Sequence, residues 1–260
     1  MGSAKDIIVK PISSSDARKI VRAIHYSGKV TQNSQLHLGV FLDGKCGGAM
    51  QFGPSLDKRK LQGFIEGTLW NEFIELNRMA FADWLPRNSE SRALGYAFRW
   101  MRKQYPHIKW CVSFADAAQC GDGTIYRASG FVLTKIGKNT SLWKKDSHVI
   151  ADVTVKAGAI SRHTHTKGGH TSRSNGKASM AAYAAEGYKP IPGFQLRYIY
   201  FIDPTARQRL TVPIIPFSEI QRRGAGMYKG KPTSVTSIAS DAPANQAGEG
   251  GAIPTVTLSE

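Results

Sequence analysis

Apolar and polar residues alternate in the first quarter of the chain in a way that predicts short strands around one helix. Three runs have this alternation: residues 6–11, 36–42 and 46–52. Asp43-Gly44 between the last two is a strong signal for a tight hairpin. Ser13 to Asp16 form a cap signal before an amphipathic helix whose pattern ends at Gly28. The chain therefore begins with a predicted strand, a helix and a hairpin.

The central part of the chain predicts a strand, a long helix and a second strand. An apolar run extends from Phe73 to Phe81, and apolar residues then recur at helical spacing from Ala93 to Met101. Asn88 or Ser89 is placed to cap this helix, and Pro106 ends it. The elements that follow are a strand over 108–115, a turn with two glycines, a short helix with Tyr126, and a strand from Phe131.

Composition divides the chain into four predicted parts. We predict an α/β core over residues 1–155 and a mobile basic loop, rich in Gly, Ser and His, over 156–190. Residues 191–230 contain a strong strand over 194–202 and a packing segment, and we predict that they complete the core. Residues 231–260 have few aromatics and are predicted to be a disordered tail.

The balance of charge favours an anionic partner. Lys and Arg number 35 against 19 Asp and Glu, which gives a formal net charge of +16. Nucleic acid fits this charge because neutralising phosphates releases counterions, although a basic protein without such a partner has the same composition. No apolar run approaches membrane-spanning length and the N-terminus has no signal-peptide pattern. We expect no membrane contact and a cytoplasmic location.

Cysteine and histidine do not form a clear metal-binding pattern. Cys46, Cys111 and Cys120 are too scattered for a disulfide framework and are expected to be reduced thiols. A second group, His163, His165 and His170, has no accompanying carboxylate or cysteine and is more useful as positive charge than as a metal site.

Four local patterns could carry chemistry, and each has an ordinary structural alternative. The strand that leads into the helix start near Arg87 and Arg92 offers backbone N–H groups to an anion, or is simply a capped helix. His25-Tyr26 at a helix end is a packing pair or a site with a titratable imidazole. Asp116 follows a strand, as site residues of α/β proteins do, or caps the next helix.

The fourth pattern is the short basic run Lys58, Arg59 and Lys60. Such a run is usually a solvated face, and beside a nucleic-acid site it is a phosphate contact.

The order of three motifs resembles the GNAT acyltransferase superfamily. The motifs are Glu75-Leu76-Asn77-Arg78, the loop over 87–93, and Tyr126-Arg-Ala-Ser-Gly130-Phe131. The resemblance implies an α/β (α+β) fold with a mixed, mostly antiparallel central sheet flanked by helices, here with a C-terminal extension. It implies donor-binding roles for six residues: Arg78, Arg87, Asn88, Ser89, Ser91 and Arg92. It also implies that Tyr126 protonates the leaving group. The loop departs from the superfamily because Asn88, Ser89 and Ser91 stand where glycines are usual.

Longer phrases are similar to the phage Mom family, which modifies adenine in DNA. They are HYSGKV, MQFGPSLDKRK, ELNRMAF, LPRNSESRAL, SFADAAQCGDGTIYRASGFVLT and PGFQLRYIYFID. The resemblance implies an enzyme that places a carbamoylmethyl group on N6 of adenine and so protects DNA from restriction. It implies acetyl-CoA and iron as cofactors, with His25, Tyr26 and Asp116 as catalytic residues and as ligand-type residues for the metal.

A carbamoylmethyl group has the same formula as a glycyl group, so a glycyl donor such as glycyl-tRNA is an alternative to acetyl-CoA. tRNA is then a possible second partner besides double-stranded DNA with a flipped adenine. Expected DNA contacts are Lys58, Arg59, Lys60 and Arg197, and candidates for stacking on the base are Trp70, Trp84, Phe52 and Tyr198. The competing hypotheses are a coenzyme A-dependent N-acetyltransferase of a protein or small amine, and a non-catalytic basic DNA-binding protein.

Overall fold

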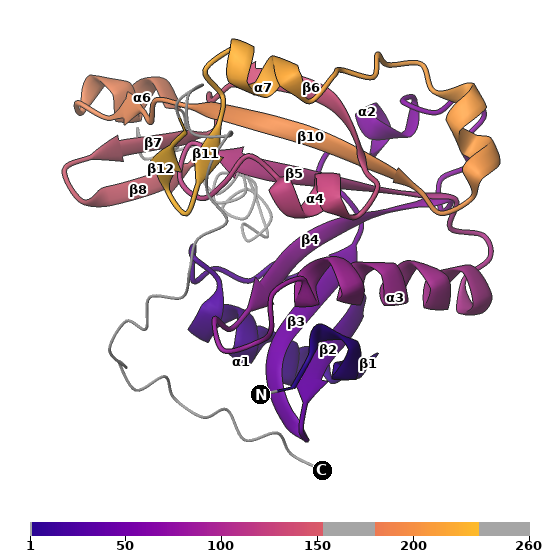
Figure 1. The fold of residues 1–260 in the computed structure, drawn as a ribbon. Helices are drawn as coiled ribbons and strands as arrows, with labels where there is room; N and C mark the ends of the chain where they lie inside the picture. Colours follow the sequence, from indigo (N-terminus) through magenta and orange to yellow (C-terminus); the bar gives the residue numbers. More distant parts are fainter. Residues whose placement is uncertain (1, 153–179, 234–260) are drawn as a thin grey trace, which may run out of the picture.

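The computed structural model describes residues 2–152 and 180–233 and is built on a seven-stranded mixed sheet in the order β1-β2-β3-β4-β5-β10-β6 (Figure 1). Its strands are β1 (Ile8–Pro11), β2 (Leu36–Leu42), β3 (Lys45–Gly53), β4 (Phe73–Phe81), β5 (Trp110–Ala117), β6 (Val132–Lys138) and β10 (Phe194–Phe201). Neighbours in this sheet run antiparallel apart from the parallel pair β4 and β5. The predicted mixed, mostly antiparallel central sheet is confirmed.

The parallel strands β4 and β5 separate along their length. They pair only from Phe73 opposite Trp110 to Glu75 opposite Val112, although β4 continues to Phe81 and β5 to Ala117. Figure 1 shows the two strands diverging beyond this point. Beyond Glu75 and Val112 the facing backbone groups of the two strands are therefore not paired with each other, and we call this region between the strands the β4–β5 gap.

Helices α3 (Ser89–Gln104) and α4 (Thr124–Ala128) pack on one face of the sheet (Figure 1). The apolar stripe predicted for the long helix is the buried one, with Leu94, Phe98 and Met101 in the main core. Phe98 stacks on Tyr200 of β10 with ring centroids 4.0 Å apart. This packing joins the strand contributed by the C-terminal part of the chain to the central helix.

The opposite face is covered in two halves. Helix α1 (Ser14–Ile24) packs on β3 through Ala17 and Ile20, and its predicted Ser13 cap accepts the Asp16 N–H at 3.0 Å. Helix α2 (Lys58–Gln62) covers the β5 and β10 half together with the following loop. Sequence reasoning treated the α2 residues as a basic run, because five residues are too few for a helical period to appear.

The part of the chain after β6 contains a second, small sheet in the order β8-β7-β9. Its strands are β7 (Leu142–Lys145), β8 (His148–Ala151) and β9 (Lys189–Pro190), and α6 (Met180–Ala185) precedes β9. Residues 180–190 were expected to be loop. They differ because β9 pairs with β7, while the Asn139 amide donates to the carbonyls of Leu142 and Ile191 at 2.9 and 2.8 Å. Residues 153–179, with His163, His165 and His170, lie outside the described residues.

The C-terminal segment packs on the core as predicted. The short elements near the two ends are η1 (Ala4–Asp6), η2 (Pro204–Arg209), α7 (Ser218–Arg222), β11 (Met227–Tyr228) and β12 (Lys231–Pro232). Ile220 and Met227 are buried in the main core. Most of the expected tail, residues 234–260, lies outside the described residues. Across 2–152 and 180–233, no helix is long and apolar enough to cross a membrane.

Candidate functional site

A hydrogen bond joins Tyr26 to Asp116. Helix α1 ends at Ile24, and the extended backbone of His25 carries the next residues away from the helix axis toward the end of β5. The Tyr26 hydroxyl donates to Oδ2 of Asp116 at 3.2 Å. Oδ1 of the same carboxylate accepts the Ala118 N–H at 3.1 Å and the Gln195 side-chain amide of β10 at 2.9 Å. Three separate parts of the chain therefore orient this carboxylate.

In this pair Tyr26 is the hydrogen-bond donor and Asp116 the acceptor. Burial raises the pKa of Asp116, and the donors on Ala118, Tyr26 and Gln195 partly oppose this shift. Tyr26 is 52% exposed, but its hydroxyl end lies against the carboxylate. Desolvation of that end, followed by the negative charge of Asp116, raises the pKa of Tyr26 above its ordinary value. The phenol therefore keeps its proton at neutral pH.

His25 lies beside this pair as a neutral imidazole. Its ring centroid is 4.4 Å from that of Tyr26. Burial, and then the charge of Arg78, lower the pKa of His25 to about 4. Nδ1 accepts the Ser27 N–H at 3.2 Å and lies 2.8 Å from the Ser27 hydroxyl, so we assign the ring proton to Nε2. In this tautomer His25 offers an N–H donor to the site.

Of the three residues expected to bind iron, Tyr26 and Asp116 are hydrogen-bonded to each other, and His25 packs beside Tyr26. The Tyr26 hydroxyl donates a hydrogen bond to Asp116, and the His25 Nδ1 atom accepts one from the Ser27 N–H. Among residues 2–152 and 180–233, no group of three His, Cys, Asp or Glu side chains is placed to hold a metal ion. Residues 2–152 and 180–233 therefore give no support for the expected iron site.

Tyr126 and Glu75 lie near the β4–β5 gap. The Tyr126 ring packs between Phe131 and Tyr198, with centroids 5.1 and 5.2 Å away. Burial raises the pKa of Tyr126 to about 12, and a hydrogen bond with Ser113 of β5 opposes the shift. Tyr126 is therefore protonated at neutral pH.

Glu75 was not predicted as a site residue. It occupies the last position at which β4 pairs with β5. Burial raises the pKa of its carboxyl group, while Ser55, Asn77 and the charge of Arg78 oppose the shift. Its charge also acts on Tyr126. The Glu-Leu-Asn-Arg motif contained this residue, but only the fold reveals that the carboxyl group is enclosed beside the gap.

Arg78 is engaged with backbone. Its Nε donates to the Lys29 carbonyl at 2.9 Å and its Nη1 to the Asn77 carbonyl at 2.7 Å. Arg78 thereby ties the turn after His25 to β4, and its charge lowers the pKa of His25. The expected role in donor binding has no direct support in these contacts.

The start of α3 combines a left-handed Asn88, at φ 71°, with an uncapped first turn. The hydroxyls of Ser89 and Ser91 donate to the carbonyls of Pro86 and Asn88 at 2.6 and 3.2 Å. Arg92 donates to the Lys5 carbonyl at 3.1 Å. The Ser89 and Arg92 N–H groups donate to the carbonyls of Pro86 and Asn88, so the N–H groups of Glu90 and Ser91 are the ones left to attract an anion.

The expected nucleic-acid contacts fall into two groups. Arg59 and Lys60 of α2 are exposed, whereas the Lys58 ammonium lies 4.7 Å from the centre of the exposed Trp70 ring. Arg197 is half-buried: its guanidinium lies 3.8 Å from the Phe64 ring centre, and its Nε donates to the Thr134 hydroxyl at 2.9 Å. Burial lowers the pKa of Arg197 to about 10.

Two of the four aromatic residues expected to stack on a base cannot do so. Phe52 and Tyr198 are fully buried, so those expectations are wrong. They sit on strands whose inward positions the alternation did not reveal. The exposed rings of Trp70 and Trp84 each lie near a lysine, with the Lys45 ammonium 5.0 Å from the centre of Trp84.

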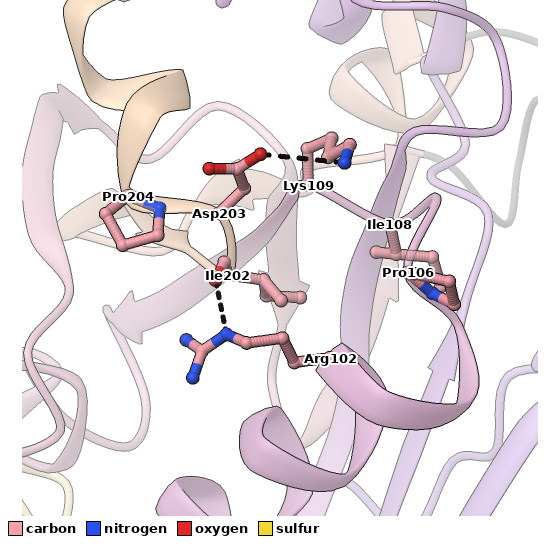
Figure 2. A pocket seen from close by; sticks show the side chains of 7 residues that line it. All are labelled: Arg102, Pro106, Ile108, Lys109, Ile202, Asp203 and Pro204. Atoms are coloured by element: carbon pink, nitrogen blue, oxygen red, sulfur yellow. Dashed lines mark hydrogen bonds and ion pairs between the residues drawn. The ribbon is translucent and has the colours of Figure 1, made fainter.

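A separate pocket lies near the beginning of β5 (Figure 2). Figure 2 shows Arg102 and Lys109 on its wall, with Arg102 donating to the Ile202 carbonyl at 2.9 Å and Lys109 3.5 Å from Asp203. Asp116 is six residues beyond the first residue of β5, which is about 20 Å along a strand. This pocket is therefore distinct from the Tyr26–Asp116 site.

The Mom protein family model matches residues 6–219. This chain belongs to the Mom protein family. The resemblance expected from the sequence is confirmed, and the match includes Tyr26, Asp116 and Tyr126. The chain is also 35% identical over 214 residues to methylcarbamoylase mom of Escherichia phage Mu, covering 81% of this chain and 82% of that protein.

Two solved structures of acetyltransferases are also similar to this member of the family. One is a GNAT family acetyltransferase from Elizabethkingia anophelis with acetyl-CoA bound, 11% identical, with a TM-score of 0.40 over 75% of this chain and 98% of that one. The other is an N-acetyltransferase from Staphylococcus aureus Mu50, 10% identical, with a TM-score of 0.42 and the same coverages, 75% and 98%.

Proposed function

We propose that this chain is a DNA-modifying transferase that attaches a group with the composition of carbamoylmethyl to N6 of adenine. The observation that carries the proposal is membership of the Mom family together with 35% identity to a methylcarbamoylase. The net charge of +16 supports a polyanionic substrate, which we take to be double-stranded DNA. Location in the cytoplasm of the bacterial host follows from that substrate.

The acceptor amine is proposed to meet Asp116. The adenine N6 group is conjugated with the ring and lies inside the duplex, so the base must be extruded and its N–H must be polarised. Asp116 is oriented by Tyr26 and Gln195, and its raised pKa makes the carboxylate a better proton acceptor. A carboxylate at this position favours the adenine amine over guanine, whose corresponding atom is an oxygen acceptor.

The donor is proposed to lie along the β4–β5 gap. N6 forms a bond to the carbonyl carbon of the donor and gives its proton to Asp116. The leaving oxygen or sulfur departs with the electron pair of the broken bond and takes the proton of Tyr126, whose pKa of about 12 keeps it protonated until then. Negative groups of the donor are attracted to the uncapped start of α3.

Atom balance favours a glycyl ester, such as glycyl-tRNA, over acetyl-CoA. An acetyl group contains no nitrogen, so making a carbamoylmethyl group from it requires an amine source and an oxidant, which iron chemistry would have to supply. A glycyl group is an isomer of carbamoylmethyl, and converting one into the other requires neither. The net charge of +16 suits tRNA as a second nucleic acid as well as DNA.

Modification at N6 explains a protective role. The N6 amine is the donor that adenine presents in the major groove, where restriction enzymes read sequence. A bulky substituent there removes the recognised donor and blocks close approach. We propose that phage DNA carrying this group escapes restriction.

The proposal is tested by mass spectrometry of nucleosides from cells that express the protein or its Asp116→Ala variant, grown with ¹⁵N-glycine. We expect a deoxyadenosine that is heavier by one glycyl-sized unit, carries the label, and is absent with the variant. A product without label would indicate that the donor is acetyl-CoA and not a glycyl ester. Unmodified DNA from folded wild-type protein would contradict the proposal, and the two competing hypotheses would then be separated by coenzyme A binding and by salt-sensitive DNA binding.

A further inference from the structure

The aromatic side chain of Phe114 in β5 is exposed to solvent. It lies in β5 beyond Val112, where β10 still pairs with the strand but β4 has diverged, and it is 42% exposed. Alternation along the strand places its side chain on the same face as Val112 and Asp116. Val112 is fully buried under the α2 region, so the cover ends between these two positions.

Phe114 is exposed because helix α1 and the α2 region cover different parts of this face of the sheet and leave the part between them open. The α1 cover packs on β3 through Ala17 and Ile20, while the α2 cover reaches Val112 and Ile199. Between these covers, the exposed ring of Phe114 is available to a planar ligand.

The surroundings of Phe114 are held rigid. In the register of β5 and β10, Arg197 is opposite Phe114 and Gln195 is opposite Asp116. Arg197 is fixed by its contact with Phe64 and by its hydrogen bond to Thr134, so its planar group cannot swing away to a distant phosphate. Arg197 therefore stays with Phe64 and Thr134, and the 42% exposed ring of Phe114 remains free to stack on the π-face of a nucleobase.

We propose that Phe114 is the platform on which the extruded adenine stacks. This inference rests on the proposed function and names the subsite for its acceptor base. Phe114 and Asp116 are two residues apart on one face, about 7 Å along the strand, so a purine lying on the ring extends its edge toward the carboxylate. The base is then held by its face on Phe114 and by its N6 amine on Asp116.

The other aromatic residues fit this role less well. Phe52 and Tyr198 are buried, and the rings of Trp70 and Trp84 each have a lysine ammonium within 5.0 Å of their centres. Tyr26 is exposed, but its hydroxyl is committed to Asp116. Phe114 combines an open ring with a position on the same strand face as the proposed proton acceptor.

Replacement of the ring tests the platform. Phe114→Leu keeps an apolar side chain but removes stacking, and Phe114→Trp restores it. Tyr96→Ala is the matched control, because Tyr96 is 40% exposed and lies on α3 against the other face. We expect kcat/KM for DNA modification to fall about 5- to 150-fold in Phe114→Leu and to stay near wild type in Phe114→Trp and in the control.

A second measurement does not depend on catalysis. 2-Aminopurine replaces adenine in a short single-stranded oligonucleotide, and its fluorescence is quenched when it stacks on an aromatic ring. Wild type and Phe114→Trp should quench it, and Phe114→Leu should bind the oligonucleotide with similar salt dependence but without quenching. Thermal unfolding of each variant establishes that it is folded.

The outcomes separate the two proposals. Modified DNA from wild type with an unchanged Phe114→Leu variant would overturn the platform and leave the function standing. Quenching that depends on the ring, without any modified DNA, would support the base-stacking subsite and contradict the proposed function. Equal quenching by wild type and Phe114→Leu would overturn the platform whatever the activity.

Discussion

The Tyr26 hydroxyl and the Asp116 carboxylate, 90 residues apart in sequence, are joined by a hydrogen bond of 3.2 Å. This bond attaches the turn after α1 to the end of β5, and Gln195 of β10 binds the other oxygen of the same carboxylate. A group held from two sides keeps one orientation, which is what a proton acceptor for a weakly nucleophilic amine requires.

Removal of the Tyr26 hydroxyl should impair turnover. Tyr26→Phe keeps the ring and deletes the donor to Asp116, and a hydrogen bond to a charged group contributes about 1.5–3 kcal/mol. We expect kcat for DNA modification to fall about 10- to 100-fold. Tyr188→Phe is the control, since the Tyr188 hydroxyl bonds to His148 in the small sheet at 2.7 Å. Equal loss in both variants would indicate a structural effect and contradict a role for the Tyr26–Asp116 bond.

Removal of the Tyr126 hydroxyl should slow the chemical step without unfolding the protein. Tyr126→Phe preserves the packing against Phe131 and Tyr198 but removes the proposed proton donor. General acid catalysis typically contributes 10²–10⁴-fold, so we expect a loss of about 100-fold or more in single-turnover rate. Tyr200→Phe, which keeps the stack on Phe98, is the matched control. Wild-type rates in Tyr126→Phe would assign leaving-group protonation to another group.

Glu75 should make the stability of the protein depend on pH. Burial raises the folded-state pKa of Glu75 above the ordinary value of 4.5, so the favourable protonated form is lost as pH rises through the raised value. The carboxyl group thus contributes stability below about pH 4.5 and opposes folding at higher pH. Gln resembles the protonated form at every pH.

We therefore expect the difference in melting temperature, Glu75→Gln minus wild type, to be larger and more positive at pH 8 than at pH 4. Thermal unfolding by circular dichroism measures both proteins in the same buffers. Glu66→Gln serves as the control because Glu66 is exposed and lies in the loop after α2. A difference between Glu75→Gln and wild type that does not change with pH would show that the Glu75 carboxyl is not buried as described.

Arg59 and Lys60 should contribute phosphate contacts rather than catalysis. Both side chains are exposed on α2, and each phosphate contact adds about 0.9 to the slope of log affinity against log salt. The double variant Arg59→Gln/Lys60→Gln should reduce that slope by about 2 with little change in saturated turnover. Arg99→Gln/Lys103→Gln removes the same two charges from exposed positions on α3 and is the control. Equal slopes for the two double variants would show that α2 makes no specific contribution to the DNA interface.

Local sequence was sufficient for the elements whose signals come from near neighbours. The hairpin at Asp43-Gly44 forms with φ of 50° and 77°, the left-handed values that favour these two residue types. Helix α3 begins at Ser89 and ends before Pro106, as its apolar period and its flanking residues predicted. The six longer motifs, from HYSGKV to PGFQLRYIYFID, also identified the family, because long matches of chemistry-bearing residues are rare by chance.

Tertiary structure alone decided which of these elements meet. Strand β10 inserts between β5 and β6 and so brings Gln195 to Asp116, a contact between residues 79 positions apart. Periodicity indicates that a residue is on one face of a strand, but pairing order and register depend on packing across the whole sheet. The sequence identified Asp116 and Tyr126 as candidate site residues, but it could not show which residues surround them. The enclosure of Glu75, the burial of Phe52 and Tyr198, and the exposed ring of Phe114 appear only when the helices cover the sheet.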